Sequence, residues 1–277
     1  MLCRWIASVS LAPCLDDAHG FATAQGGQAQ MAANIQTLRN APHNCNIIVD
    51  DWTYFLEAPF QEGVIAQAVT TVTNGGALYF SDAANSGNLA HGTSGTWEGD
   101  FVNGGAVATP ISESGTLHSF GANNYNTFTG YNTSFCYTVL SWSDPMGASS
   151  NDYDLFILNS AGTSVLFQST TTQAGTQNPQ EYVSNCTNLT GARIVIVNYQ
   201  GAAAARALRI DTERGRLAVG TNGNTFGHNG GVNTITTAAV NVATASGGMF
   251  VGGAANPVEN FSSDGPRRLF YTPAGTA

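Results

Sequence analysis

The sequence predicts an α/β fold: a partial doubly wound parallel sheet that is interrupted by an all-β sandwich or jelly roll. Residues 20–88 alternate strand-like and helix-like segments, which is the pattern of a parallel sheet with crossover helices. Residues 89–214 show almost no helical periodicity and many short β-branched runs between turn signals, which is typical of a β-sandwich. The predicted domains are therefore an α/β part over residues 1–88, an inserted sandwich over 89–214, and a return to the α/β part over 215–277.

The α/β part begins with an amphipathic helix over residues 26–41. Met31, Ile35 and Leu38 recur at spacings of four and three, which places them on one helical face. Pro42 follows directly and ends the helical pattern.

A strand–helix–strand unit comes next. Residues 47–49 are a short apolar run of β-branched residues, which indicates a buried central strand. Residues 60–73 hold apolar side chains at helical spacing, and residues 74–76, Asn-Gly-Gly, end that helix. Residues 77–80 are the second strand. A right-handed unit of this kind places ligand sites beyond the carboxyl ends of its strands.

Three polar residues, Asp50, Asp51 and Asn85, follow those strands at that edge. Adjacent residues of a strand point to opposite faces, so Asp50 and Asp51 cannot both act on one proton. The alternatives are a solvated strand end for Asp51 and a turn-forming role for Asn85.

This block resembles the core of subtilisin-like serine peptidases (subtilases). Residues 83–87, Ala-Ala-Asn-Ser-Gly, are similar to a family turn, with Ala84 where the family usually has Gly, and residues 259–266 resemble a family loop with Phe-Ser-Ser-x-Gly-Pro. The resemblance implies that Asn85 is an oxyanion-hole donor, a role worth about 3–4 kcal/mol of transition-state stabilisation. It also implies that Asp51 and Asp50 bind a polypeptide substrate. Asp51 is the better candidate to line the groove, because it aligns with the family strand that binds the substrate backbone.

The family's other catalytic motifs are missing from the sequence. No Gly-Thr-Ser-x-Ala-x-Pro phrase follows residues 259–266, and nothing before Gly26 matches the family's Asp and His motifs. His91 and Ser94 combine letters of two motifs, but a base and a nucleophile three residues apart on a loop lack an orienting third group, so we expect neither to be catalytic. No Ser lies in a Gly-x-Ser-x-Gly elbow, which argues against a conventional esterase.

The β-rich segment carries a second resemblance. Residues 142–145, 151–156 and 178–181 are similar to phrases of the pre-peptidase C-terminal sandwich that is attached to secreted bacterial peptidases. The aromatic side chains of this segment, among them Trp142 and Tyr182, would form either a ligand-binding face or the core of the sandwich.

Three functional hypotheses follow. The first is a fragment of a secreted subtilisin-like serine endopeptidase that lacks the nucleophile, so that enzymatic activity of this chain stays open. The second is a non-catalytic binding or interaction protein whose sandwich holds a protein or carbohydrate ligand. The third and weaker one is an esterase-type hydrolase.

Composition narrows the partners and the compartment. There are 18 carboxylates and nine basic residues, all of them Arg, so the sequence offers no basic cluster for nucleic acid. Only 10% of residues are charged, and Gly, Thr, Asn and Ser abound, which favours a secreted protein without a membrane partner. Residues 1–18 form a poor export signal, and we expect instead that the chain begins within the domain.

The cysteines and acidic pairs give weaker signals. Cys136 and Cys186 are either a disulfide, as suits an oxidising compartment, or two buried thiols. No Cys or His spacing suggests zinc. Asp152 and Asp154 share a strand face, but two carboxylates are too few for a metal site, so the sequence predicts no cofactor, with Ca²⁺ as the alternative.

Overall fold

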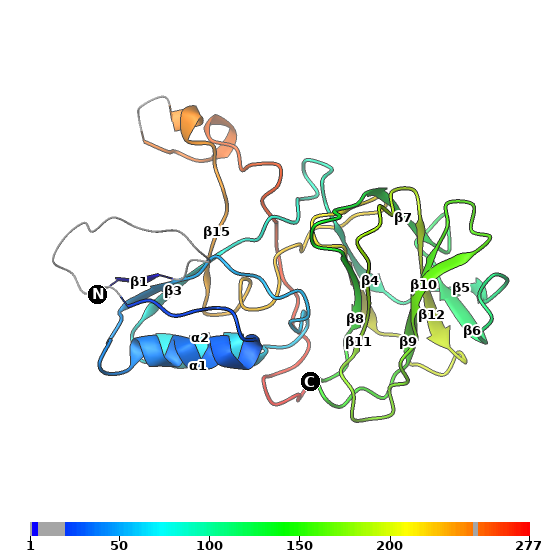
Figure 1. Cartoon of the computed structure of the whole chain (residues 1–277), viewed down its shortest axis with the longest axis horizontal. Helices are drawn as coiled ribbons and strands as arrows, with labels where there is room; N and C mark the ends of the chain where they lie inside the picture. Colours follow the sequence, from blue (N-terminus) through cyan, green and yellow to red (C-terminus); the bar gives the residue numbers. More distant parts are fainter. Residues whose placement is uncertain (1, 5–19, 246–248) are drawn as a thin grey trace.

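The computed structural model describes residues 2–4, 20–245 and 249–277, and its secondary structure is dominated by β-strands. Strands make up 28% of the chain and helices 11%, so the fold is built mainly from sheets. Figure 1 shows a small sheet with two helices on one side of the molecule and a larger β-sandwich on the other. No helix among the described residues is long and apolar enough to cross a membrane.

The small sheet is parallel and has the strand order β1-β2-β3-β15. Its strands and helices are β1 (Leu2–Arg4), α1 (Gln28–Arg39), β2 (Ile47–Val49), α2 (Val64–Asn74), β3 (Leu78–Asp82) and β15 (Ile235–Thr237). The helix α2 buries Ile65, Val69 and Val72 on one face, and these join Ile35 of α1 and Ile48 of β2 in one apolar core. Both helices lie on the same side of the sheet in Figure 1.

The sandwich consists of two antiparallel sheets. Their strands are β4 (Thr96–Asp100), β5 (Asn103–Ala106), β6 (Gly115–His118), β7 (Asn126–Gly130), β8 (Tyr137–Trp142), β9 (Tyr153–Leu158), β10 (Val165–Ser169), β11 (Gln180–Ser184), β12 (Arg193–Tyr199), β13 (Ala207–Asp211) and β14 (Arg216–Leu217). One sheet has the order β11-β8-β13-β4, and the other has the order β10-β9-β12-β6-β5, with β7 beside β12 and β14 beside β7. Alternate apolar residues of both sheets, such as Leu140, Trp142, Ile157 and Ile196, meet in a shared core.

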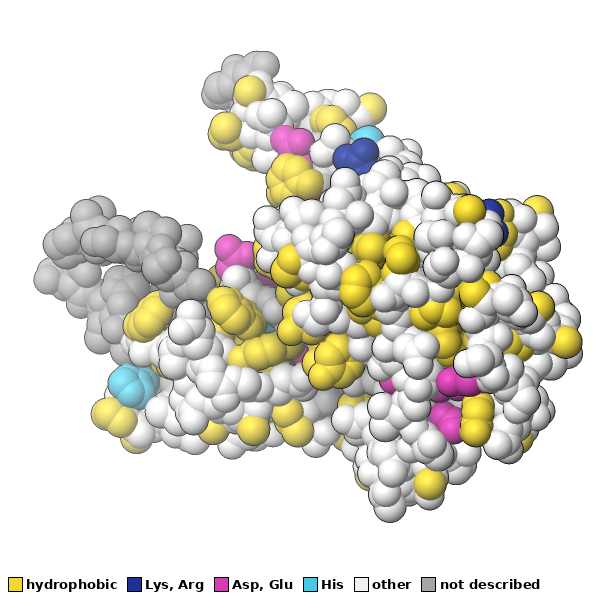
Figure 2. All heavy atoms as spheres, turned by 45° about the vertical axis from the view of Figure 1, so that its right-hand side comes forward, with side chains coloured by type: hydrophobic (Ala, Val, Ile, Leu, Met, Phe, Trp, Pro, Cys, Tyr) yellow, Lys and Arg dark blue, Asp and Glu magenta, His cyan; other side chains and the backbone are white. Residues whose placement is uncertain are grey.

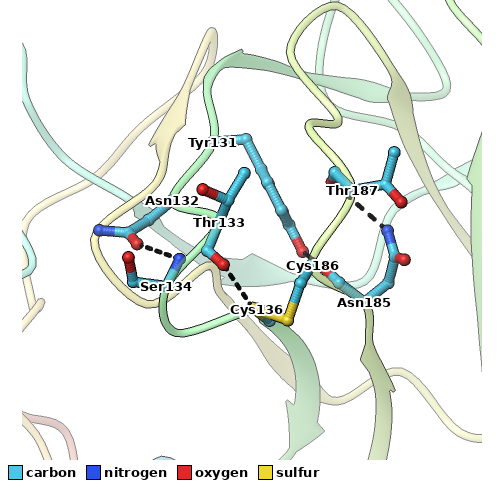
Figure 3. Close-up of a disulfide and its surroundings, with 8 residues drawn as sticks. All are labelled: Tyr131, Asn132, Thr133, Ser134, Cys136, Asn185, Cys186 and Thr187. Atoms are coloured by element: carbon cyan, nitrogen blue, oxygen red, sulfur yellow. Dashed lines mark hydrogen bonds between the residues drawn. A yellow bond between two sulfur atoms is a disulfide. The ribbon is translucent and has the colours of Figure 1, made fainter.

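A disulfide joins Cys136 and Cys186, so the bonded alternative holds (Figure 3). It ties the segment before β8 to the segment after β11. The backbone N–H of Asn185 donates to the carbonyl of Cys136 at 2.7 Å, and the Tyr131 hydroxyl donates to the carbonyl of Asn185. Cys45 is also disulfide-bonded.

The two parts of the chain contact each other through aromatic side chains and backbone groups. The Phe55 ring lies 5.8 Å from that of Phe135 and 6.5 Å from that of Tyr137 on the sandwich, measured between ring centroids. Near the end of the chain, the Tyr271 hydroxyl donates to the carbonyl of Ser143 at 2.9 Å. The sandwich is therefore packed against the small sheet.

The predicted fold class is wrong. A doubly wound sheet carries helices on both faces, whereas this structure has two α-helices in its described residues, both on one side, and a parallel sheet of four strands. The largest cluster of buried apolar side chains lies in the antiparallel sandwich. The strand–helix–strand pattern fixes only local parallel pairing, and it does not determine how many strands or helical layers follow.

The resemblance to subtilisin-like serine peptidases is also wrong for this chain, because that family has an α/β fold and this structure is predominantly β. The description of the protein as a serine protease is therefore also wrong. Of residues 1–18, on which the expectation about the start of the chain depended, only Leu2–Arg4 lies in the described part.

Candidate acidic groove at the sheet edge

A groove of about 410 Å³ lies beyond the carboxyl ends of the parallel strands. It is lined by residues 49–51, 80–85, 237–239 and Ser262. The carboxyl ends of parallel strands meet at one edge of a sheet, and this groups the side chains that follow β2, β3 and β15. Asp50, Asp51 and Asn85 all belong to the lining, so the structure brings the three predicted site residues together.

Asp50 is buried below the groove and is held by neighbouring polar groups. Its Oδ1 accepts a hydrogen bond from the Ser81 hydroxyl at 2.8 Å and lies 3.4 Å from Nε2 of His228. The Trp52 backbone N–H lies 3.3 Å from the same oxygen. Asp50 is therefore part of an internal network.

His228 compensates the buried carboxylates. Its Nδ1 lies 2.6 Å from Oε1 of Glu57, and its backbone N–H donates to Oε2 of the same carboxylate at 2.7 Å. Burial alone would lower the pKa of this imidazole, but the charges of Glu57 and Asp50 and their hydrogen bonds raise it to about 10. The ring is 0% exposed, so it serves as a fixed internal cation and cannot reach a ligand in the groove.

Asp82 stands at the end of β3 and is half-buried in the lining. Its Oδ1 accepts from Nδ2 of Asn229 at 2.8 Å, and its Oδ2 accepts from the backbone N–H of Ala84 at 2.7 Å. Burial raises its pKa to about 6, and the charges of Asp50 and Asp51 act in the same direction. The groove therefore carries more negative charge than its surroundings neutralise.

Asp51 and Asn85 line the groove, and their side chains are free to contact a ligand. Among the described residues, no hydrogen bond or ion pair within 4 Å involves either side chain. Arg214 is a nearby cation. Burial lowers its pKa below the ordinary value, and the charges of Asp82 and Asp51 only partly oppose this shift. Its guanidinium lies 4.1 Å above the ring of Phe135 and forms no ion pair with a described carboxylate. Basic side chains are sparse on the face shown in Figure 2.

The groove contains no activated nucleophile. The hydroxyl of Ser81 donates to Asp50, and that of Ser262 accepts from the backbone N–H of Ala239 at 3.1 Å. In the part of the chain that the structure describes, no His ring nitrogen forms a hydrogen bond with a Ser, Thr or Cys side chain. A hydroxyl nucleophile needs such a base, so an acyl-transfer site is not formed there.

His91 and Ser94 also stay apart. Ser94 is 3% exposed, and its hydroxyl donates to the carbonyl oxygen of Thr221 at 2.6 Å. The Nδ1 atom of His91 lies 2.8 Å from Oδ1 of Asn88. Ser94 therefore holds the start of the sandwich against its end and has no catalytic geometry.

Four residues of this region were not singled out as site residues from the sequence: Glu57, Asp82, His228 and Asn229. Asp82 could have been predicted from its position, because it ends a strand of the parallel sheet. Glu57 and His228 are 171 residues apart, and only the folded chain joins them. The oxyanion-hole role of Asn85 was implied only by the resemblance to subtilisin-like peptidases, which is wrong for this chain.

No family model matches this chain. No curated protein matches it either. Among solved structures, the chain is weakly similar to a cycloisomaltooligosaccharide glucanotransferase from Paenibacillus sp., described in complex with cycloisomaltoheptaose, with 7% sequence identity and a TM-score of 0.19. That match covers 60% of this chain and 24% of the glucanotransferase chain, so it spans about a quarter of that enzyme. At this level the similarity supports no statement on the fold or the activity of the present protein.

Proposed function

We propose that this protein is a binding protein whose acidic groove takes a cationic group, an alkylammonium or a guanidinium. The observation that supports it is the meeting of Asp51 and Asp82 in one groove, where burial and then the charges of Asp50 and Asp51 raise the pKa of Asp82 to about 6. A bound cation would relieve that repulsion. The volume of the groove, about 410 Å³, suits a small ligand or one side chain of a larger one.

Each lining group has a distinct part in this proposal. His228 shares one positive charge between Glu57 and the buried Asp50, and the carboxylates that lie in the groove beside a ligand are Asp51 and Asp82. Asn85 offers a free amide, whose oxygen accepts a hydrogen bond from an ammonium or guanidinium N–H. Specificity for a cation then comes from two carboxylates and one neutral acceptor.

Binding is preferred to catalysis because the described lining has no nucleophile paired with a base. It is also preferred to the hypothesis of a ligand on the sandwich aromatics. Trp142, Tyr153 and Phe156 are each at most 2% exposed and fill the core, whereas Tyr182 of β11 is 48% exposed. Three of these four rings are therefore closed to a sugar or peptide. The groove is thus the better candidate for the contact with a partner.

The test is calorimetric titration of the whole chain at pH 7.5 with three probes: tetralysine peptide, free agmatine and a neutral tetraserine peptide. We expect the cationic probes to bind, more weakly as salt rises, and the neutral peptide not to bind. Preference for tetralysine over agmatine identifies a polypeptide source of the cation, and the reverse identifies a small molecule.

The variant Asp51→Asn should weaken binding of the preferred probe by about 5-fold, which corresponds to roughly 1 kcal/mol for one partly exposed charge contact. The matched control is Asp100→Asn, which removes the same charge from an exposed position on β4 of the sandwich. Equal binding by the two variants, or binding of tetraserine as tight as that of tetralysine, would refute the proposal.

A further inference from the structure

One cationic side chain of the sandwich, Arg214, lies close to the acidic groove of the small sheet. It belongs to the tight turn between β13 and β14, in which the backbone N–H of Gly215 donates to the carbonyl of Thr212 at 3.0 Å. The two central residues of this turn, Glu213 and Arg214, have φ angles of 46° and 68°, which residues other than glycine rarely adopt. Glu213 is 0% exposed, whereas Arg214 is exposed, so the turn presents the guanidinium at the surface.

Arg214 makes no polar contact with any other described residue. Its guanidinium forms no ion pair and donates no hydrogen bond there. It lies 4.1 Å above the ring of Phe135. The segment that carries this ring is held in place, because the next residue, Cys136, is bonded to Cys186 (Figure 3). An exposed guanidinium whose N–H groups are free, and which rests on an aromatic ring, is a ready contact for a carboxylate.

Aromatic contacts link Arg214 to the groove. Phe55 follows Asp51 by four residues on the loop after β2, and its ring centroid lies 5.8 Å from that of Phe135. Burial lowers the pKa of the Arg214 guanidinium, and the charges of Asp82 and Asp51 oppose that shift, so both carboxylates lie within electrostatic range of it. Neither forms an ion pair with it. The cation and the two carboxylates are therefore close to each other but separated.

The groove also contains a hydrogen-bond acceptor without a donor. Asp50 lines the groove and is 3% exposed. Its Oδ1 accepts from the Ser81 hydroxyl, but its Oδ2 is a buried atom that has no hydrogen-bond partner among the described residues. Because a buried acceptor without a donor is costly, this oxygen favours a ligand that brings N–H groups into the groove.

A ligand that satisfies both ends of this arrangement carries charges of both signs. A simple cation is attracted by Asp51 and Asp82 but is repelled by Arg214, and a simple anion is repelled by the two carboxylates. A molecule with a cationic group at one end and a carboxylate at the other makes a favourable contact with each. Its apolar linker can rest on the rings of Phe55 and Phe135.

We propose that the ligand of the groove is a small zwitterion, with its cationic group held by Asp51 and Asp82 and its carboxylate held by Arg214. The class includes a basic amino acid such as arginine, either free or at the carboxyl end of a polypeptide. This inference rests on the proposed function, because it takes the cation site as given and adds a second charge. Arg214 then selects the zwitterion over a cation that has no carboxylate.

The test compares two probes that differ in one carboxylate. Agmatine is arginine without its carboxylate, so both probes offer the same guanidinium and amino groups. In calorimetric titration of the whole chain at pH 7.5, we expect arginine to bind about 5-fold more tightly than agmatine, the effect of one partly exposed charge contact, although agmatine carries the larger positive charge. If the tripeptide Gly-Gly-Arg binds as tightly as arginine, the source is a polypeptide end; if it binds more weakly, the source is the free amino acid.

Three variants examine the role of Arg214. Arg214→Gln should weaken the binding of arginine by about 5-fold and leave that of agmatine unchanged or tighter, because only arginine contacts the guanidinium. Arg214→Lys keeps the charge and should retain part of the preference for arginine. The matched control is Arg216→Gln, which removes the same charge from an exposed position on β14 and should keep the full preference.

The outcomes separate this inference from the proposed function. If agmatine binds and arginine does not bind more tightly, the zwitterion is refuted and the cation site stands. If Arg214→Gln weakens both probes equally, or if Arg216→Gln abolishes the preference to the same extent, Arg214 has no specific role and the inference is overturned. If neither probe binds, the proposed function is refuted and this inference with it.

Discussion

At the scale of single residues, Asp82 makes the groove sensitive to pH. Its carboxyl group is stabilised by the Ala84 N–H and destabilised by burial and by neighbouring charges, and the balance raises its pKa to about 6. A cation is attracted only by the ionised form. Protonation of this one residue therefore changes the charge of the groove near neutral pH.

We expect the affinity for a cationic probe to rise as pH increases through about 6 and to level off above pH 7. The variant Asp82→Asn should have a flat profile over the same range, at the low-affinity level, because the amide cannot ionise. Titrations with the preferred probe from pH 5 to pH 8 provide the measurement. A pH dependence that persists in this variant would show that another group is responsible.

Glu213 illustrates the opposite case, a carboxyl group that the fold keeps neutral. It is 0% exposed, and burial followed by the charge of Asp211 raises its pKa to about 9. Because its folded pKa lies above its unfolded value, the fold favours the protonated form. Its contribution to stability is complete below about pH 4.5 and is lost as pH rises through about 9.

The variant Glu213→Gln should therefore raise the free energy of unfolding by about 1–3 kcal/mol at pH 7, and by less at pH 5. Denaturant titrations at both values measure this, and the exposed Asp100→Asn serves as the control. A loss of stability at pH 7 would mean that the neutral acid forms contacts that the amide cannot reproduce.

At the scale of elements, the salt bridge between His228 and Glu57 joins two loops to the end of the parallel sheet. The pKa of His228 is raised to about 10, so the pair contributes fully below the unfolded value of about 6.5, and the contribution disappears as pH rises towards 10. Both partners are buried, so removing Glu57 leaves the His228 imidazolium with only Asp50, whose Oδ1 lies 3.4 Å from Nε2.

We expect Glu57→Gln to lower the free energy of unfolding by about 3 kcal/mol at pH 7 and by less at pH 10, where the imidazole of the unmodified protein loses its proton. Chemical denaturation at the two values distinguishes this from a general packing defect. A penalty that is the same at both would argue against a charged His228.

At the scale of the whole molecule, sequence reasoning succeeded where structure is local. The run at Tyr137–Trp142, one of the short apolar and β-branched runs of the β-rich segment, forms β8, because such residues between turns encode a strand directly. The helix expected at residues 26–41 occurs as Gln28–Arg39 for a similar reason. The fold class failed because strand count, helix placement and the dominance of antiparallel sheets depend on long-range packing, which no short phrase records.

The candidate site was likewise predictable only where it depends on local structure and strand pairing. Asp50, Asp51 and Asn85 meet in the groove because the ends of parallel strands must share an edge. The contact between Asp50 and His228 joins residues 178 positions apart and could not be predicted from the sequence, whereas Asp51 was already the better groove candidate there.

The strands β3 and β15 are neighbours in the sheet although about 150 residues separate them. The first and last residues of the inserted sandwich lie side by side, because the backbone N–H of Leu217 donates to the carbonyl of Ser94 at 3.1 Å. Once the sandwich is folded, it thus shortens the connection between β3 and β15, and the entropy lost in pairing them falls accordingly. We infer an order of assembly in which the sandwich forms first and the last wall of the groove, supplied by residues 237–239, is completed only afterwards.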